Sequence, residues 1–299
     1  MGSSQLSIPQ SPEVVFTLTT VTLFSKSTSK SYYISFYKNF QKASPNERQY
    51  LISEILTLFL ESFPNIENLN EFIEYYFYNQ NSIQTNLGII RDKKTNDIIS
   101  FSVYYYTEFY FLPNNKSKEN RYIADTMVGV ISKSSRIVGL QSLYYKTKAL
   151  MDFLDYPDCN LLHFNVSINP LAYYAMCKSY MCVFPSYNQT TTKTIEDYLD
   201  RLFLVFNIKK YNDSPFLAFD NFDVDESRLE TAFRDFEKWT GHLKFYVDIT
   251  GLKKNVGLGF IALNNMIKGN TLGVEGKNYL FKEIPDVEVS EIVFKDPKI

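Results

Sequence analysis

Hydrophobic and polar residues follow two periods along the first part of the chain. β-Branched and aromatic residues alternate with polar ones over residues 14–24 and 31–38, which predicts two strands. Residues 44–47 read Ser-Pro-Asn-Glu, a capping motif, and apolar residues at helical spacing follow it. A helix is therefore predicted from Pro45 onward, and a second one over residues 70–80.

The middle of the chain combines strands with amphipathic stretches. Polar residues 92–97 divide the apolar stretch 86–106, which predicts a hairpin. The remaining patterns predict strands over 121–131, 160–168 and 182–187, and helices over 139–154 and 170–180. From residue 31 to 187 the predicted order is strand, helix, helix, three strands, helix, strand, helix, strand.

Beyond residue 190 the pattern is less regular. It predicts helices that begin near 194 and 227, strands over 242–249 and 256–264, and a polar tail from 275 with short extended pieces. We therefore divide the chain into an N-terminal extension (1–30), a main α/β domain (31–190) and a C-terminal elaboration of helices and strands (191–299).

The composition narrows the class of protein. Aromatic residues make up 16% of the 299 residues, so the chain can bury a large core. The formal net charge of −2 argues against a general nucleic-acid binder or a membrane-surface protein. The three cysteines have neither paired nor metal-ligand spacing, which favours a reducing, cytoplasmic compartment.

The turn between the strand at 121–131 and the next helix carries the most specific motif. It reads Arg136-Ile137-Val138-Gly139-Leu140-Gln141. The first N–H groups of a helix lack intrahelical partners and carry partial positive charge, so such a turn can bind phosphate. Glycine at position 139 would let the backbone approach the ligand closely.

A second motif, Asn169-Pro-Leu-Ala172, caps and starts the helix over 170–180. Together with the order of elements, the two motifs resemble the GCN5-related N-acetyltransferase (GNAT) family over about half of the chain. The first resembles that family's Q/R-x-x-G-x-G/A turn, and the second its N-x-x-A helix start. The resemblance implies an α/β fold with a mixed, mainly antiparallel sheet flanked by helices, here with an extended C-terminal part.

The resemblance also implies a function. Acetyl-CoA or another acyl-CoA would supply an acyl group, which an amine would take by direct attack on the thioester. Residues 136–141 would bind the pyrophosphate, and Asn169 would lie near the pantetheine or the thiolate. A backbone N–H near Val128 and Val130 would hold the oxyanion. The expected acceptor is a small-molecule amine or a protein lysine, with neither nucleic acid nor a membrane as partner.

Two positions depart from the family's pattern. Gln141 stands where the motif has a small residue, and Met176 stands where the family often has a general-acid tyrosine. Tyr173 and Tyr180 lie nearby in the sequence and are the alternative candidates for that role. These departures leave two alternatives open: a catalytically inactive GNAT-like binding protein, and an interaction protein with an aromatic surface.

Such an enzyme also needs a base for the attacking ammonium, often a carboxylate on or near the central strand. Asp125 and Glu108 are the candidates, and we select Asp125. The simpler interpretation of both is a solvated carboxylate, whereas burial would raise the pKa of the group and make it a better base. For His163 and Cys177 the simpler interpretation is a structural role in the core.

Overall fold

The computed structural model describes most of the 299-residue chain. The described residues are 17–25, 30–63, 69–110, 121–132, 144–145, 148–149, 151–152, 155–156, 159–180, 182–187, 189–219, 240–253, 255–263 and 287–295. The turn at 136–141 and the helix predicted to begin near 227 lie outside these ranges, so both stay predictions.

The elements follow the predicted order closely. The strands are β1 (Thr17–Ser25), β2 (Lys30–Lys38), β3 (Gln84–Asp92), β4 (Ile98–Tyr110), β5 (Arg121–Ile131), β6 (Asn160–Ser167), β7 (Val183–Phe184), β8 (Leu217–Phe219), β9 (Val256–Leu263) and β10 (Val287–Lys295). The helices are η1 (Phe40–Lys42, a 3-10 turn), α1 (Pro45–Ser62), α2 (Leu69–Phe77), α4 (Pro170–Ser179), α5 (Lys193–Val205) and α7 (Gly241–Thr250). Between β5 and β6, residues 144–145, 148–149, 151–152 and 155 are helical, and we call this segment the crossover helix.

Local signals account for several helix starts. Ser44 accepts a hydrogen bond from the Glu47 N–H, and the Glu47 side chain accepts one from the Ser44 N–H, so the predicted capping box is confirmed. The Asn169 side chain accepts a hydrogen bond from the Leu171 N–H, at 2.9 Å, and Pro170 occupies the first helical position of α4.

The strand predicted over 242–249 is wrong, because this segment forms α7. Alternating apolar residues fit a strand, but the structure buries Tyr246 and Thr250, which are four residues apart, against the core. Lys244 and Asp248 are also four residues apart and form an ion pair on the exposed side, at 2.9 Å. The helical period therefore sorts the apolar and charged residues of this segment better than the strand period.

The strands of the described residues join one mixed sheet of ten strands. The order is β10-β1-β2-β3-β4-β5-β6-β9-β7, with β8 also paired to β9. Every pair is antiparallel except β5 and β6, which the crossover helix connects in parallel. The predicted fold class, an α/β protein with a mainly antiparallel sheet flanked by helices, is thus confirmed.

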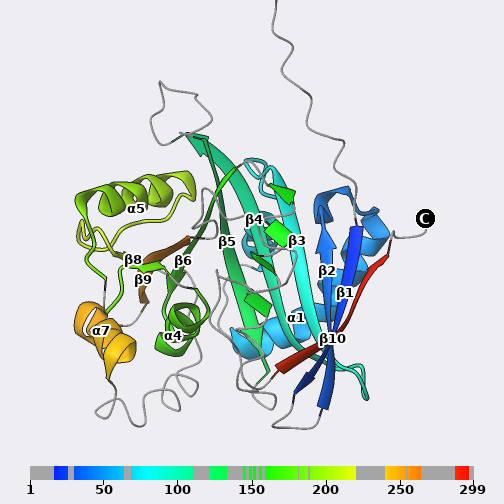
Figure 1. Ribbon diagram of the computed structural model, residues 1–299. Coiled ribbons are helices and arrows are strands. Elements are labelled where there is room, and N and C mark those ends of the chain that lie inside the picture. The colour runs from blue at the N-terminus through cyan, green and yellow to red at the C-terminus, as the bar shows by residue number, and fades with distance from the viewer. Residues whose placement is uncertain are drawn as a thin grey trace, which may run out of the picture.

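Helices cover both faces of the sheet (Figure 1). On one face α1, α2 and α5 bury apolar side chains that include Phe59, Phe72 and Leu202. On the other face the crossover helix, α4 and α7 bury Tyr144, Tyr173 and Tyr246 among others. The polar side chains of the candidate site lie on this second face.

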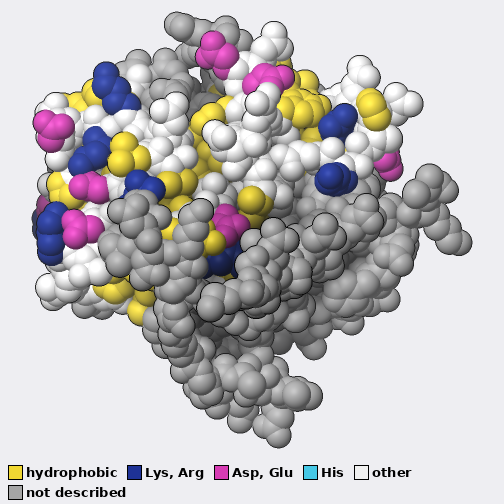
Figure 2. All heavy atoms as spheres, turned by 90° about the horizontal axis from the view of Figure 1, so that it is seen from above, with side chains coloured by type: hydrophobic (Ala, Val, Ile, Leu, Met, Phe, Trp, Pro, Cys, Tyr) yellow, Lys and Arg dark blue, Asp and Glu magenta, His cyan; other side chains and the backbone are white. Residues whose placement is uncertain are grey.

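Viewed from above, the described surface carries side chains of both charges (Figure 2). Lys and Arg residues alternate there with Asp and Glu residues, and apolar side chains lie between them. Within the described ranges, none of the helices combines the length and the apolar character that a membrane span needs.

The parallel pairing of β5 with β6 is short. It runs from Tyr122 opposite Asn160 to Asp125 opposite His163, although β5 continues to Ile131 and β6 to Ser167. In the described part of the chain, residues 126–131 of β5 therefore have no strand partner on the β6 side. The two parallel strands separate there, toward their carboxyl ends.

The ladder between β4 and β5 shows which backbone groups face this gap. The Ser132 N–H donates to the Ile99 carbonyl at 2.8 Å, so this opposed pair is hydrogen-bonded. Hydrogen-bonded and non-hydrogen-bonded pairs alternate along an antiparallel ladder. The backbone groups of Met127, Gly129 and Ile131 therefore point away from β4, toward the side where the pairing with β6 stops.

Candidate functional site

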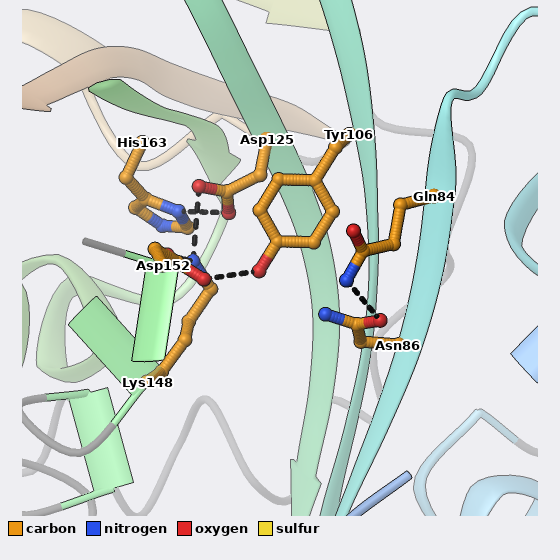
Figure 3. A network of polar contacts seen from close by, with 7 residues as sticks. All are labelled: Gln84, Asn86, Tyr106, Asp125, Lys148, Asp152 and His163. Atoms are coloured by element: carbon orange, nitrogen blue, oxygen red, sulfur yellow. Dashed lines mark hydrogen bonds and ion pairs between the residues drawn. The ribbon is translucent and has the colours of Figure 1, made fainter. Parts of the chain in front are cut away.

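A row of polar side chains crosses the sheet where β5 and β6 begin to separate (Figure 3). Tyr106 of β4 lies opposite Asp125 of β5, and Asp125 lies opposite His163 of β6. Directly paired residues project from the same face of a sheet, so these three side chains are neighbours. Asp125 and His163 form the last pair of the parallel ladder.

The crossover helix adds two charged side chains to this row, Lys148 and Asp152, which lie one helical turn apart. The Lys148 Nζ lies 3.0 Å from Asp125 Oδ1 and 2.5 Å from Asp152 Oδ2. Asp125 Oδ2 lies 2.6 Å from His163 Nδ1, and the Tyr106 hydroxyl donates to Asp152 Oδ1. We call these five residues the acid–base cluster.

The acid–base cluster is fully enclosed, and none of its five side chains is more than 3% exposed. Burying a charge is costly unless an opposite charge and hydrogen bonds compensate it. Lys148 meets this condition through two carboxylates, and its Nζ also lies 4.9 Å from the ring centre of Tyr104 and 5.2 Å from that of Tyr106. The interpretation of Asp125 as a solvated carboxylate is therefore wrong.

The environment moves the pKa values of these groups in different directions. Burial raises the pKa of Asp125, but Lys148 and then His163 outweigh it, so the pKa lies below its ordinary value. Burial lowers the pKa of Lys148, but the two carboxylates raise it above its ordinary value. Burial raises the pKa of Asp152 to about 6, although Lys148 lowers it. Asp125 is thus held ionised, whereas Asp152 titrates near neutral pH.

Side-chain amides continue the polar row onto β3. Gln84 lies opposite Tyr106, and its Nε2 donates to Asn86 Oδ1 at 2.9 Å. The Tyr156 hydroxyl donates to Gln84 Oε1 at 2.6 Å, and the Asn39 N–H donates to Asn86 Oδ1 at 2.9 Å. These bonds compensate the burial of both amides and fix the strand next to the acid–base cluster.

The site residues predicted on the central strand β5 lie on different faces of the sheet. The side chains of Val128 and Val130 are buried on the face that α1 covers, away from the acid–base cluster. Gly129 lies between them, is exposed, and has its backbone directed to the gap. Of the backbone N–H groups between Val128 and Val130, that of Gly129 is therefore the one directed to the gap.

The predicted tyrosines differ in their position. Tyr173 is buried, its hydroxyl donates to the Pro185 carbonyl at 2.9 Å, and burial raises its pKa. The ring of Tyr180 lies parallel to that of His163, with ring centres 6.1 Å apart, and burial raises its pKa as well. Met176 is buried in the same layer. The structure thus brings Tyr180, but not the Tyr173 hydroxyl, to the acid–base cluster.

Three other candidates have ordinary structural contacts. Glu108 forms an ion pair with Arg121 on the neighbouring strand, with Nε and Oε1 2.7 Å apart. Cys177 is buried in the core cluster of α4, as the simpler interpretation predicted. The side chain of Asn169 caps α4, two residues after β6 ends.

Sequence reasoning missed Tyr106, Lys148 and Asp152. A signal was present for two of them, because Tyr144, Lys148 and Asp152 recur at intervals of four and therefore share one helix face. Tyr144 belongs to the apolar face of the predicted helix, so charges in register with it indicate a buried ion pair. The contribution of Tyr106 depends on strand register, which the sequence does not define.

Comparison with known proteins gives only distant likenesses. No family model matches the chain, and no curated protein sequence matches it significantly. The similar solved structures include an acetyltransferase of the GNAT family from Streptococcus pneumoniae, with 16% identity, 54% of this chain and 92% of that chain covered, and a TM-score of 0.30.

Two further solved structures are similar to the same extent. A candidate phosphinothricin N-acetyltransferase has 11% identity, covers 54% of this chain and 92% of its own, and gives a TM-score of 0.31. AtaT in complex with acetyl-methionyl-tRNAfMet has 9% identity, covers 47% of this chain and 82% of its own, and gives a TM-score of 0.27. Likenesses at these values do not indicate an activity, which has to be inferred from the site itself.

Proposed function

We propose that the protein is an acyl-CoA-dependent N-acyltransferase that transfers an acetyl or other acyl group to an amine. One observation carries this proposal. The parallel strands β5 and β6 stop pairing at Asp125 and His163, and a buried acid–base cluster lies at the closed end of the resulting gap. A ligand in the gap could hydrogen bond to the unpaired backbone groups of β5, and the acid–base cluster beside it could accept a proton.

The residues along the gap suit the pantetheine arm of coenzyme A. That arm is an extended chain with amide groups, which can hydrogen bond to a strand edge as another strand would. Met127, Gly129 and Ile131 direct their backbone groups to this side of β5. Gly129 adds no side chain there, and a Cβ at this position would lie only 2.8 Å from Ser102 Oγ.

Each part of the reaction has a proposed residue. The turn at 136–141 would bind the pyrophosphate through helix N–H groups, and Asn169 would lie near the pantetheine or the thiolate. The Gly129 N–H, between Val128 and Val130, would hold the oxyanion. The acid–base cluster, which includes Asp125, would accept the proton of the amine. Acyl-CoA would supply the activated acyl group as a thioester.

Calorimetric titration with acetyl-CoA tests the proposal directly. We expect binding in the micromolar range, and we expect Gly139→Leu to abolish it, because a bulky side chain would keep phosphate away from the backbone. The melting temperature of the variant provides the control for folding. A wild-type chain that does not bind acetyl-CoA would refute the cofactor and the enzyme together.

A second candidate is a GNAT-like protein that binds acyl-CoA without catalysis. It is favoured by Tyr173, whose hydroxyl is already bonded to Pro185, and by the buried Met176 at the position of the family's general acid. Thiol release from acetyl-CoA, measured with a panel of primary amines, separates the two candidates. Binding without thiol release would select the second.

A further inference from the structure

We propose that His163, rather than Asp125, takes the proton from the acceptor amine, and that Asp125 is the positioning residue that orients the imidazole. This inference rests on the proposed N-acyltransferase function and deepens it. It gives the role of proton acceptor to His163, for which the sequence analysis favoured a structural role. The orientation of the ring, the state of Asp125 and the charge around the ring lead to it, and the place of His163 in the sheet agrees with it.

The first step is the orientation of the imidazole. His163 Nδ1 lies 2.6 Å from Asp125 Oδ2, and a carboxylate accepts hydrogen bonds, so Nδ1 carries the proton. The lone pair of the neutral ring is therefore on Nε2. Nε2 is buried, and among the described residues it has no hydrogen-bond partner. A buried nitrogen with a free lone pair matches a ligand that presents an N–H group, as an amine does.

The second step is the state of Asp125. Its Oδ1 contacts Lys148 and its Oδ2 contacts His163, so both oxygens already have partners. Burial raises the pKa of Asp125, but Lys148 and His163 together lower it by more than burial raises it. The pKa is therefore below its ordinary value, which makes this carboxylate a weak base. It is nevertheless well placed to stabilise an imidazolium and to hold the ring in one tautomer.

The third step is the charge around the ring. Asp125, Asp152 and Lys148 are the charged residues of the acid–base cluster. The rings of Tyr145 in the crossover helix, Tyr180 at the C-cap of α4 and Phe260 in β9 face His163. Because the pKa of Asp152 is about 6, both carboxylates are mostly ionised at neutral pH against one ammonium. A proton that arrives at the ring therefore finds an ionised carboxylate, that of Asp125, already in contact with the imidazole.

The position in the fold agrees with this role. His163 belongs to the last pair of the β5–β6 ladder, at the closed end of the gap that we propose for the cofactor. In the reaction, the amine nitrogen forms a bond to the acyl carbon while one of its protons passes to Nε2. The carbon–sulfur bond breaks with its electron pair on sulfur, and the imidazolium returns the proton to the thiolate or to solvent.

Nuclear magnetic resonance can test the tautomer, because the chain has only two histidines, His163 and His242. With 15N-labelled histidine and the variant His242→Gln for assignment, we expect neutral His163 to be protonated at Nδ1 and free at Nε2. Asp125→Asn should produce a mixture of tautomers, because the amide no longer imposes one orientation. A His163 ring protonated at Nε2 in its neutral form would overturn the inference.

Kinetics provide the second test, with thiol release from acetyl-CoA in the presence of spermidine, tyramine or a lysine-containing peptide. We expect His163→Gln to lower kcat by about 100-fold or more, while acetyl-CoA binding by calorimetry is unchanged. The matched control His242→Gln should keep the wild-type rate. Melting curves report whether His163→Gln folds, and His163→Asn serves as the second variant.

The outcomes separate this inference from the proposed function. A wild-type chain that binds no acetyl-CoA, or releases no thiol with any of these amines, overturns both. An active wild-type chain whose folded His163→Gln variant keeps the wild-type rate overturns the role of His163 alone. In that case Asp125 becomes the proton acceptor again.

Discussion

Lys148 is the residue on which the acid–base cluster depends. It is the ammonium that lies between the carboxylates of Asp125 and Asp152, and its side chain is completely buried. A buried ion pair adds little net stability relative to apolar residues, but removal of one partner leaves the other charge without compensation. The cluster is therefore easy to break from this position.

We predict that Lys148→Met strongly destabilises the fold. The methionine fills a similar volume but leaves two buried carboxylates near each other, at a cost of about 3–5 kcal/mol in the free energy of unfolding. Urea unfolding followed by circular dichroism measures this change. The matched control is Lys244→Met, whose exposed partner Asp248 is also four residues away, with a change of about 0.5 kcal/mol or less. Equal effects in the two variants would contradict the prediction.

Asp152 gives a prediction on pH dependence. Burial raises its pKa to about 6 in the folded state, above the value of about 3.9 in an unfolded chain. The folded state thus holds this proton more tightly, so the stabilising contribution is complete below about pH 4 and is lost as the pH rises through about 6. Asp152→Asn removes this loss and keeps a polar partner for Tyr106 and Lys148.

The stability of Asp152→Asn relative to wild type should accordingly improve between about pH 4 and pH 7, by up to a few kcal/mol. Melting temperatures of both proteins across this range measure the difference. The exposed Asp248→Asn provides the control. A difference between Asp152→Asn and wild type that stays constant with pH would show that Asp152 titrates normally.

At the scale of elements, the crossover helix lies close to the sheet because β3 has a glycine beneath it. A Cβ added to Gly88 would lie 2.2 Å from the hydroxyl of Tyr144 and 2.6 Å from its ring. The ring of Tyr144 also stacks on Phe36 of β2, with ring centres 5.4 Å apart, so it has little room to move. Gly88 therefore sets the distance at which Lys148 and Asp152 reach the strands.

We predict that Gly88→Ala lowers the free energy of unfolding by about 1–3 kcal/mol, because overpacking displaces the crossover helix. Chemical denaturation measures this change. If the helix moves, thiol release should fall as well, since Lys148 no longer reaches Asp125. Unchanged stability would mean that Tyr144 can leave its position freely.

Asn169 allows the capping role and the proposed cofactor role to be separated. Asn169→Ala should cost about 1 kcal/mol of stability because the first turn of α4 loses its cap, whereas Asn169→Ser keeps a capping oxygen. If the side chain also contacts pantetheine, both variants should bind acetyl-CoA more weakly in calorimetry. Wild-type affinity in the serine variant would limit Asn169 to capping.

Local patterns explain why most elements were predictable from the sequence. Ser44, Glu47 and Asn169 determine helix starts through bonds to their own neighbourhood, and β4 and β5 are long enough to be recognised by composition alone. The strand prediction for residues 242–249 was wrong because the apolar residues of this segment alternate as in a strand. Only the packing of Tyr246 against the core reveals the helix. Short segments are defined by what they pack against.

The candidate site was predictable only in part, for a related reason. Asp125 was found because it lies on a recognisable strand, but its partners come from β6 and from the crossover helix. The pairing of Asp125 with His163 depends on the register of two strands that are far apart in the sequence. Register is fixed by packing across the whole sheet, so His163 could be interpreted only as a core residue.

At the scale of the whole molecule, the C-terminal part of the chain completes the sheet at the site. β9 lies between β6 and β7 and pairs with β6 from Leu162 to Ser167. Its Phe260 ring lies 6.3 Å from that of His163 and 5.7 Å from that of Tyr173. β6 therefore has β9 as its strand partner where β5 has already separated from it.

We predict that a chain shortened to residues 1–190 does not fold cooperatively, although it contains the predicted main domain. Without β9, β7 loses its partner, and β6 exposes an unpaired edge beside the apolar residues that Phe260 covered. Thermal melting and size-exclusion chromatography should show an aggregated chain without a cooperative transition.

The control for this truncation is a chain of residues 1–286, which lacks only β10 at the outer edge of the sheet. It keeps β9 and every residue of the acid–base cluster, so it should remain folded with lower stability. A cooperative transition in the chain of residues 1–190 would mean that β6 needs no partner on the β9 side. The imidazole of His163 would then be oriented by Asp125, Tyr180 and the crossover helix without Phe260.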